Sequence, residues 1–267
     1  MVIKHIVIAG GGPTGLVSYG ALRYLNQVGL WNKEELKTVY TSSIGGFIGV
    51  LATLDYKWNV IDDYIIERPW EKAFAAMKYD ILEIMYNKGI NGKQMFEICL
   101  TPLLTGLDLS PSITLREYFE HTNIELVFTA TEINNDMCIQ GELISYKSYP
   151  DMELVEALAC TSAFPMLFKP VFVGDKCFVD GGLIHNYPLN HCLKETQCNV
   201  EEVLAFTNKV GGISRIEEAS SFIEYARMMM KKCHWTLETS KNQHEVPNSV
   251  VSVTTDLSDM TVWFETL

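Results

Sequence analysis

The chain opens with an apolar run that is followed directly by a glycine-rich loop. Residues 2–9 are rich in β-branched side chains, which is typical of a buried strand. The loop spans residues 10–15 with the sequence GGGPTG, and a helix is expected after it over residues 14–28. A strand, a tight loop and a helix in this order begin a parallel α/β sheet, so this feature limits the fold class more than any other.

The alternation of strand and helix continues along the chain. Residues 36–41 predict a second strand, a turn follows at residues 42–46, and residues 47–54 predict a buried helix. Residues 58–104 carry apolar side chains at helical spacing and predict a helical insertion. Further strands are expected over residues 125–131, 137–145, 171–173, 176–179, 203–207 and 250–253, and further helices over residues 115–121, 151–160 and 216–232. We therefore expect one domain over residues 1–267, an α/β fold of three layers (α/β/α) around a mostly parallel sheet.

Charge and composition exclude several classes of function. The chain has 21 Lys and Arg residues against 33 Asp and Glu residues, a formal net charge of −12, so no nucleic-acid partner is expected. Its seven cysteines form no C-x-x-C pair and indicate reduced thiols in a cytoplasmic location, without a metal site. We expect neither an export signal nor a transmembrane segment, because the apolar runs at residues 2–9 and 44–54 are short and lead into or contain glycines.

The glycine loop is suited to holding a negative charge. Gly10, Gly11, Gly12 and Gly15 allow backbone N–H groups to point at an anion near the start of a helix. One candidate is the pyrophosphate of FAD, as in a flavin-dependent oxidoreductase, and the other is the oxyanion of an acyl-transfer intermediate. A dinucleotide site needs an acidic residue about 20 residues beyond the loop, at the end of the second strand. That strand ends in Thr41, which weakens the flavin alternative without removing it.

A serine follows the second strand at a turn of small residues. Ser43 occupies the nucleophile position of a G-x-S-x-G elbow, with Gly45 two residues later and Thr41 in place of the first glycine. Ser42 is the weaker candidate, because no glycine stands two residues after it. Most serines before a helix act only as caps, so this spacing alone does not distinguish a nucleophile from a cap.

A second motif supplies the base that such a serine needs. Asp180 stands at the end of an expected strand in the sequence FVDGG and is followed by Gly181 and Gly182. A carboxylate that is desolvated at a strand end and within hydrogen-bond reach can activate a serine. With both motifs, the glycine loop and the segment ALACTSAFP at residues 157–165, the chain resembles the patatin-like phospholipase family over about residues 1–190.

The resemblance implies a lipid acyl hydrolase that works through a Ser-Asp dyad and an acyl-enzyme intermediate. Ser43 would be the nucleophile, Asp180 the general base, and the N–H groups of Gly11 and Gly12 the oxyanion hole. The expected activity is that of a phospholipase A or lysophospholipase. Its partner would be a lipid or membrane-surface substrate, met by peripheral contact, and no cofactor or metal ion would be needed.

Departures from the family pattern leave alternatives open. Thr41 puts a side chain where strand and helix approach closely, and Pro13 and Thr14 replace the basic residue that is often found in the family's loop. A catalytically impaired lipid-binding protein of the same fold is therefore an alternative. His185 follows Asp180 by five residues and raises another, a Ser-His-Asp triad.

Overall fold

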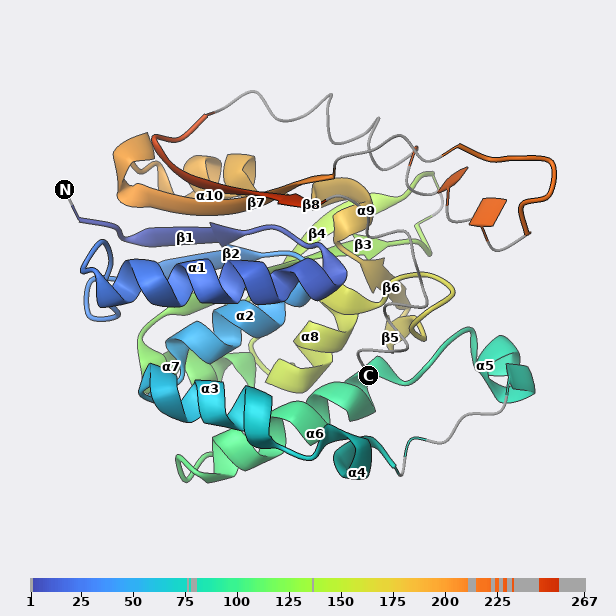
Figure 1. The fold of residues 1–267 in the computed structure, drawn as a ribbon, viewed down its shortest axis with the longest axis horizontal. Helices are drawn as coiled ribbons and strands as arrows, with labels where there is room; N and C mark the ends of the chain where they lie inside the picture. Colours follow the sequence, from blue (N-terminus) through green and yellow to red (C-terminus); the bar gives the residue numbers. More distant parts are fainter. Residues whose placement is uncertain are drawn as a thin grey trace.

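A mixed, mostly parallel sheet with helices on both faces forms the centre of the molecule (Figure 1). The computed structural model describes residues 2–75, 77, 81–135, 137–210, 215–221, 224–225, 228–229, 232 and 245–254. The expected α/β fold class, with three layers, is confirmed. Among the described residues, no helix is both long enough and apolar enough to cross a membrane.

The sheet has eight strands in the order β5-β6-β3-β2-β1-β7-β8, and β4 also pairs with β3. The parallel strands are β1 (His5–Ile8), β2 (Thr38–Thr41), β3 (Glu125–Glu132), β7 (Val203–Val210) and β8 (Asn248–Thr254). Antiparallel pairs are added by β4 (Gln140–Ile144), β5 (Val171–Val173) and β6 (Lys176–Asp180). Because the parallel strands end at one edge of the sheet, the loops after β1 and β2 meet there. The last residue of β6 lies at the same edge.

Helices cover both faces of the sheet, most of them on one side (Figure 1). They are α1 (Gly15–Gln27), α2 (Ile44–Thr53), α3 (Trp58–Glu67), α4 (Trp70–Phe74), α5 (Ile81–Asn87), α6 (Gly92–Thr105), α7 (Leu115–Thr122), α8 (Leu154–Ser162), α9 (Gly182–His185) and α10 (Leu189–Thr196). Short 3-10 turns lie at Gly12–Thr14 and Val200–Glu202. The helical insertion expected over residues 58–104 corresponds to α3, α4, α5 and α6.

Strand β1 is buried on both faces, which explains its continuous apolar sequence. Ile6 and Ile8 belong to the larger core, which includes residues of α1, α2 and α8. Val7 points the other way and packs in a smaller core with Leu189 and Cys192 of α10. A strand in the middle of a parallel sheet has no polar face, so its hydrophobic pattern does not alternate.

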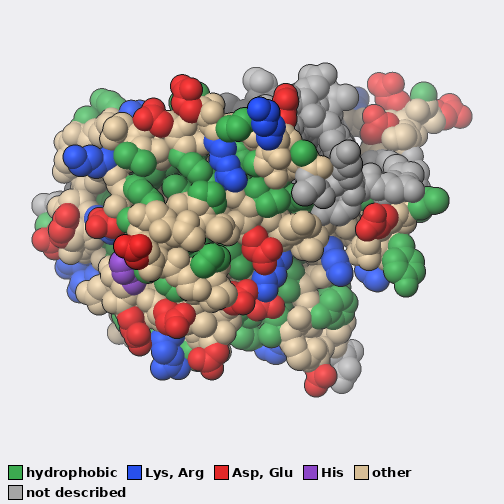
Figure 2. All heavy atoms as spheres, turned by 90° about the horizontal axis from the view of Figure 1, so that it is seen from below, with side chains coloured by type: hydrophobic (Ala, Val, Ile, Leu, Met, Phe, Trp, Pro, Cys, Tyr) green, Lys and Arg blue, Asp and Glu red, His purple; other side chains and the backbone are tan. Residues whose placement is uncertain are grey.

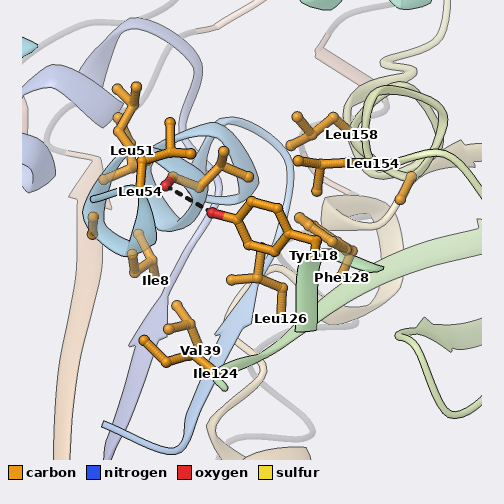
Figure 3. Packing of buried hydrophobic residues seen from close by; sticks show 14 of the residues in the cluster. Ile8, Val39, Leu51, Leu54, Tyr118, Ile124, Leu126, Phe128, Leu154 and Leu158 are labelled. Atoms are coloured by element: carbon orange, nitrogen blue, oxygen red, sulfur yellow. Dashed lines mark hydrogen bonds between the residues drawn. The ribbon is translucent and has the colours of Figure 1, made fainter. Parts of the chain in front are cut away.

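The larger core contains one buried pair of hydroxyl groups. Tyr118 of α7 is 1% exposed, and its hydroxyl lies 2.8 Å from that of Thr53 at the end of α2. Figure 3 shows this hydrogen bond among apolar side chains that include Leu126, Phe128 and Leu154. A buried hydroxyl without a partner would cost free energy, so the pair both satisfies the two groups and ties α7 to α2.

The bounds of several expected elements differ from the observed ones, and those of α2 and β4 bear on the site and the sheet. Helix α2 begins at Ile44, three residues before the expected start, and includes Gly45 and Gly46 in its first turn. Glycine usually marks a turn, but here these positions are inside a helix because they let it approach the sheet closely. Strand β4 is shorter than expected, and the helix expected over residues 216–232 lies largely outside the described residues.

Candidate active site

Ser43 lies at a strained turn between β2 and α2. Its φ is 51° and its ψ is −131°, a conformation that L-residues with a side chain rarely adopt. This backbone places the serine side chain at the edge of the sheet, where its Oγ donates a hydrogen bond to Asp180 Oδ2 at 2.7 Å. The expected elbow geometry is therefore present in the structure.

The glycines after Ser43 are required by the closeness of α2 to the sheet. A Cβ atom on Gly45 would stand 2.6 Å from the Ile8 carbonyl oxygen, which belongs to the backbone and has no freedom to move aside. On Gly46, a Cβ would lie 3.0 Å from side-chain atoms of Leu158 and Phe128. The first turn of α2 therefore presses directly on the sheet and the neighbouring helix α8.

Thr41 occupies the place of the first elbow glycine without displacing the helix. Its side chain is buried, and Oγ1 donates a hydrogen bond of 3.1 Å to the Val127 carbonyl oxygen on β3. Gly49 of α2 leaves space for the threonine methyl group, since a Cβ there would lie 3.0 Å from Thr41 Cγ2. Gly49, one turn beyond Gly45 in α2, thus makes room for threonine where the elbow pattern has glycine.

Asp180 is the last residue of β6 and is buried. Its Oδ2 accepts the Ser43 hydrogen bond, and its Oδ1 accepts one from the Gly182 N–H at 2.6 Å. The backbone of Asp180 is fixed as well, with its N–H bound to the Ala163 carbonyl oxygen at 3.0 Å and its own carbonyl oxygen bound by Thr131 Oγ1 at 2.9 Å. These hydrogen bonds hold both the backbone and the side chain of Asp180, so that the carboxylate faces the serine.

Burial controls the acidity of this carboxyl group. Desolvation raises the pKa of Asp180 from 3.8 to about 6, against the opposing effect of the hydrogen bonds from Ser43 and Gly182. At neutral pH the group is ionised and can only accept hydrogen bonds. The Ser43 proton therefore points at Asp180, as it must when a carboxylate is to remove it.

The two glycines of the FVDGG motif have steric roles. A Cβ on Gly181 would stand 2.2 Å from the Thr129 carbonyl oxygen, and one on Gly182 would stand 2.8 Å from Asp180 Oδ1. Any side chain at these positions would push β6 away from β3 or displace the carboxylate. The motif therefore needs glycine at both positions for the chain to turn into α9 at this place.

The glycine loop lies directly against Ser43. A Cβ on Gly10 would be 2.9 Å from the Ser43 Cβ, and one on Gly15 would be 2.6 Å from Ile44 Cγ1. Figure 1 shows the start of α1 at the same edge of the sheet as β6 and α9. The structure therefore brings the loop, the serine and the aspartate together, although about 170 residues separate the first from the last.

Only some of the loop N–H groups are free to bind an anion. The N–H of Gly10 donates to the Asn186 carbonyl oxygen at 3.2 Å, and that of Gly15 donates within the 3-10 turn. The N–H groups of Gly11 and Gly12 find no acceptor within the part of the chain that the structure describes. The sequence offered Gly10, Gly11, Gly12 and Gly15 for an oxyanion hole, and the hydrogen bonds already made by the Gly10 and Gly15 amides leave Gly11 and Gly12 as the candidates. Gly12 holds a φ of 54° that favours glycine.

Thr161 is a site residue that the sequence did not identify individually. Its Oγ1 accepts a hydrogen bond of 2.9 Å from the Ser43 N–H, and its carbonyl oxygen accepts one of 3.1 Å from the Gly181 N–H. One residue of α8 therefore sets the spacing between the serine and aspartate segments. Thr161 lies in the small-residue segment 157–165, which contributed to the family resemblance. That resemblance gave no role to any side chain in the segment.

His185 does not lie between the serine and the aspartate. The Ser43 hydroxyl reaches Asp180 directly, whereas the His185 ring packs edge-on against His191 with centroids 4.4 Å apart. The triad alternative is therefore inconsistent with the observed geometry. Within the described residues, no group of three His, Cys, Asp or Glu side chains is arranged to hold a metal ion.

Comparisons of sequence identify the family of the chain. The chain matches the model of the patatin-like phospholipase family over residues 6–193. "Probable lipid hydrolase 463L" of Invertebrate iridescent virus 6 is 26% identical over an alignment of 204 residues, and the match covers 72% of this chain and 63% of that protein. A relative from Acanthamoeba polyphaga mimivirus is 20% identical over 189 residues, or 70% of this chain and 60% of that protein. The chain thus spans less than two thirds of the length of these relatives.

A solved structure shows the same fold. VipD from Legionella pneumophila superimposes with a TM-score of 0.57 at 14% sequence identity, over 96% of this chain and 62% of that one. The matched family region covers more than half of this chain and contains the glycine loop, Ser43 and Asp180. The chain therefore belongs to the patatin-like phospholipase family.

Proposed function

We propose that the chain is a lipid acyl hydrolase of the phospholipase A or lysophospholipase type, with Ser43 as nucleophile and Asp180 as general base. The observation that carries the proposal is the hydrogen bond of 2.7 Å from Ser43 Oγ to a buried carboxylate, made by a serine on a strained strand-to-helix turn. Strain of this kind persists only where the surroundings hold it, and it is common at catalytic nucleophiles.

The first half of the reaction forms an acyl-enzyme. Asp180 removes the Ser43 proton while Oγ attacks the ester carbonyl carbon, and the carbonyl oxygen becomes an oxyanion. The free N–H groups of Gly11 and Gly12 and the positive end of α2 would stabilise that charge. As the ester C–O bond breaks, the proton held by Asp180 passes to the leaving alcohol, so the carboxylate is restored.

Water completes the cycle in the second half. Asp180 takes a proton from the water, whose oxygen attacks the acyl carbon and forms a second oxyanion in the same place. When the bond to Ser43 Oγ breaks, the proton returns to that oxygen and the fatty acid leaves. No electron acceptor or metal ion takes part in either half.

The position of the glycine loop favours this reaction over the flavin alternative. Gly10 lies against Ser43, so an anion bound by the next two amides would lie beside the serine hydroxyl. An oxyanion formed by attack of that hydroxyl would lie at this position. A dinucleotide would also need an acidic side chain at the end of β2, where this chain has Thr41. The observed accommodation of Thr41 likewise favours an intact elbow over an impaired binding protein.

The test is hydrolysis of a short-chain chromogenic ester and of phosphatidylcholine by the wild type and three variants. We expect Ser43→Ala and Asp180→Asn to lower kcat by about a thousandfold or more at matched folding. Ser42→Ala is the control: that hydroxyl is buried next to the nucleophile and has no partner within the described residues, so its loss should leave turnover unchanged. A wild type that binds phosphatidylcholine vesicles but hydrolyses neither substrate would contradict the proposal in favour of lipid binding.

A further inference from the structure

Two side-chain amides bind the carbonyl oxygen of Gly10. Asn208 Nδ2 on β7 donates to it at 2.9 Å, and Asn186 Nδ2, after α9, donates at 3.3 Å. Asn208 is also packed against the next residue, because a Cβ on Gly11 would stand 2.3 Å from its Nδ2. Polar side chains from two distant parts of the chain thus converge on a single peptide unit of the glycine loop.

The N–H at the other end of this peptide unit, that of Gly11, meets no acceptor among the described residues. The Gly10 carbonyl and the Gly11 N–H belong to one planar trans peptide, so they point in opposite directions. Fixing the carbonyl therefore fixes the direction of the N–H. Glycine on both sides of the bond would otherwise make rotation of the whole peptide plane easy, since neither residue has a Cβ to oppose it.

The orientation of the Asn208 amide is itself determined by β8. Its Oδ1 accepts a hydrogen bond from the Ser252 hydroxyl, which leaves Nδ2 facing Gly10. Strands β7 and β8 pair in parallel over seven residues and place Asn208 and Ser252 opposite each other. Both residues lie beyond the family match, which ends at residue 193, so no motif indicated them.

We propose that Asn208 is a positioning residue that locks the Gly10–Gly11 peptide so that the Gly11 N–H serves the oxyanion hole. Asn186 donates a second hydrogen bond to the same Gly10 carbonyl oxygen, and Ser252 sets the orientation of the Asn208 amide. The inference rests on the proposed function, because it assigns the oxyanion to the Gly11 N–H. It extends the site to strands β7 and β8.

The experiment compares Asn208→Asp with Asn248→Asp. The first change keeps the shape of the side chain but replaces the donor to Gly10 by a carboxylate that repels the carbonyl oxygen. Asn248 on β8 is a matched control, because its Nδ2 also donates to a backbone carbonyl oxygen, that of Glu201 at 3.0 Å, away from the site. Asn208→Ala is the second variant, in case the carboxylate prevents folding.

Oxyanion stabilisation acts on the transition state, so we expect a specific kinetic signature. Loss of one oxyanion donor typically lowers kcat by roughly 100-fold to 1000-fold, and a misdirected donor should cost about tenfold to 100-fold with KM unchanged. Ser252→Ala should give a smaller loss of the same kind. Asn248→Asp should retain wild-type kcat. A kcat within twofold of wild type in both Asn208 variants would overturn the inference while leaving the hydrolase proposal intact.

A second readout does not depend on activity. The Gly11 amide should give one sharp ¹⁵N NMR signal in the wild type and show exchange broadening or a second signal in Asn208→Asp, because the peptide plane can then rotate. The Asn248→Asp spectrum should match the wild type at Gly11. If Gly11 is equally ordered in all three proteins, the lock does not exist, whether or not the wild type hydrolyses esters.

Discussion

At the scale of single residues, the site depends on a carboxylate that is buried and yet ionised. Asp180 is 3% exposed, and within the described part of the chain its side chain accepts two hydrogen bonds, from Ser43 and Gly182. Burial makes the carboxylate more basic than an exposed aspartate, and basicity is what a general base requires. The same burial penalises the ionised form in the folded state, so the proposed role of Asp180 as a base is opposed by a cost in stability.

The pH dependence of hydrolysis follows from the pKa of Asp180, which is raised to about 6. A general base must be deprotonated, so we expect kcat/KM to rise with pH, reach half its maximum near pH 6 and stay constant above that. Initial rates on a soluble ester between pH 4.5 and 8 measure the profile, with near-UV circular dichroism as the control for folding. A flat profile over this range would contradict the assignment of Asp180 as the base.

The effect of Asp180→Asn on stability should depend on pH, because only the wild-type side chain titrates. Because folding raises the pKa of Asp180 from 3.8 to about 6, the folded state binds more protons than the unfolded state between these values. The free energy of unfolding of the wild type therefore falls as pH rises through this window. Asparagine carries no such penalty, so the variant should gain up to about 3 kcal/mol over the wild type at pH 7.5 and little at pH 4.

Urea denaturation of both proteins at these two pH values measures this difference. Ser43→Ala is the useful comparison, because it removes a hydrogen bond that favours the ionised carboxylate and should lower stability at pH 7.5. A variant Asp180→Asn that is less stable than the wild type at pH 7.5 would show that the ionised carboxylate is not destabilising.

At the scale of elements, the position of Ser43 depends on how closely α2 packs on β1. The helix begins immediately after the strained serine, so a shift of its first turn is transmitted directly to the nucleophile. Gly45 is the point of closest approach, with no room for a Cβ beside the carbonyl oxygens of Ile8 and Ala9. At Gly45, backbone atoms of β1 therefore set how closely α2 can approach the sheet.

Gly45→Ala should destabilise the protein and impair the site together. The added methyl group collides with backbone atoms, so we expect a loss of about 1–3 kcal/mol in the free energy of unfolding and a lower kcat. Gly20→Ala in α1 is the matched control, because a Cβ there meets no atom within 4 Å. That change should stabilise by about 0.5–1 kcal/mol through helix propensity, with kcat unchanged. Equal thermal shifts in the two variants would refute the close-approach argument.

At the scale of the whole molecule, net charge should affect the proposed encounter with a lipid surface. The formal net charge is −12, and the face in Figure 2 shows acidic and basic side chains interspersed around exposed hydrophobic atoms. A net negative protein is repelled by an anionic membrane at distances up to the Debye length, about 10 Å at 0.1 M salt. Neutral lipid surfaces do not impose this barrier.

We therefore expect faster hydrolysis of phosphatidylcholine vesicles than of vesicles in which part of that lipid is replaced by phosphatidylglycerol. Raising the NaCl concentration should reduce the difference, because salt screens the repulsion. Rates on a soluble neutral ester, measured at the same salt concentrations, provide the control for effects on the enzyme itself. Preference for anionic vesicles that disappears with salt would indicate a local basic surface that outweighs the net charge.

Much of the fold and the three motifs could be predicted from local patterns. The apolar run of β1, the glycine loop and the turn at Ser43 each depend on neighbours in the chain, so their form follows from residue type and spacing. The same holds for the strand that ends in Asp180. The start of α2 was predicted wrongly, because the rule that glycine ends a helix was overridden by contact with the sheet.

The sequence by itself determined the fold class, the family and the candidate nucleophile and base. Only the tertiary structure decided which N–H groups of the loop meet no acceptor among the described residues, that Thr161 joins the segments of Ser43 and Asp180, and that Asn208 contacts the loop from 198 residues away. The physical reason is that these are single hydrogen bonds between distant segments. Their directions depend on the packing of the whole sheet, and no periodicity or spacing within the chain encodes them.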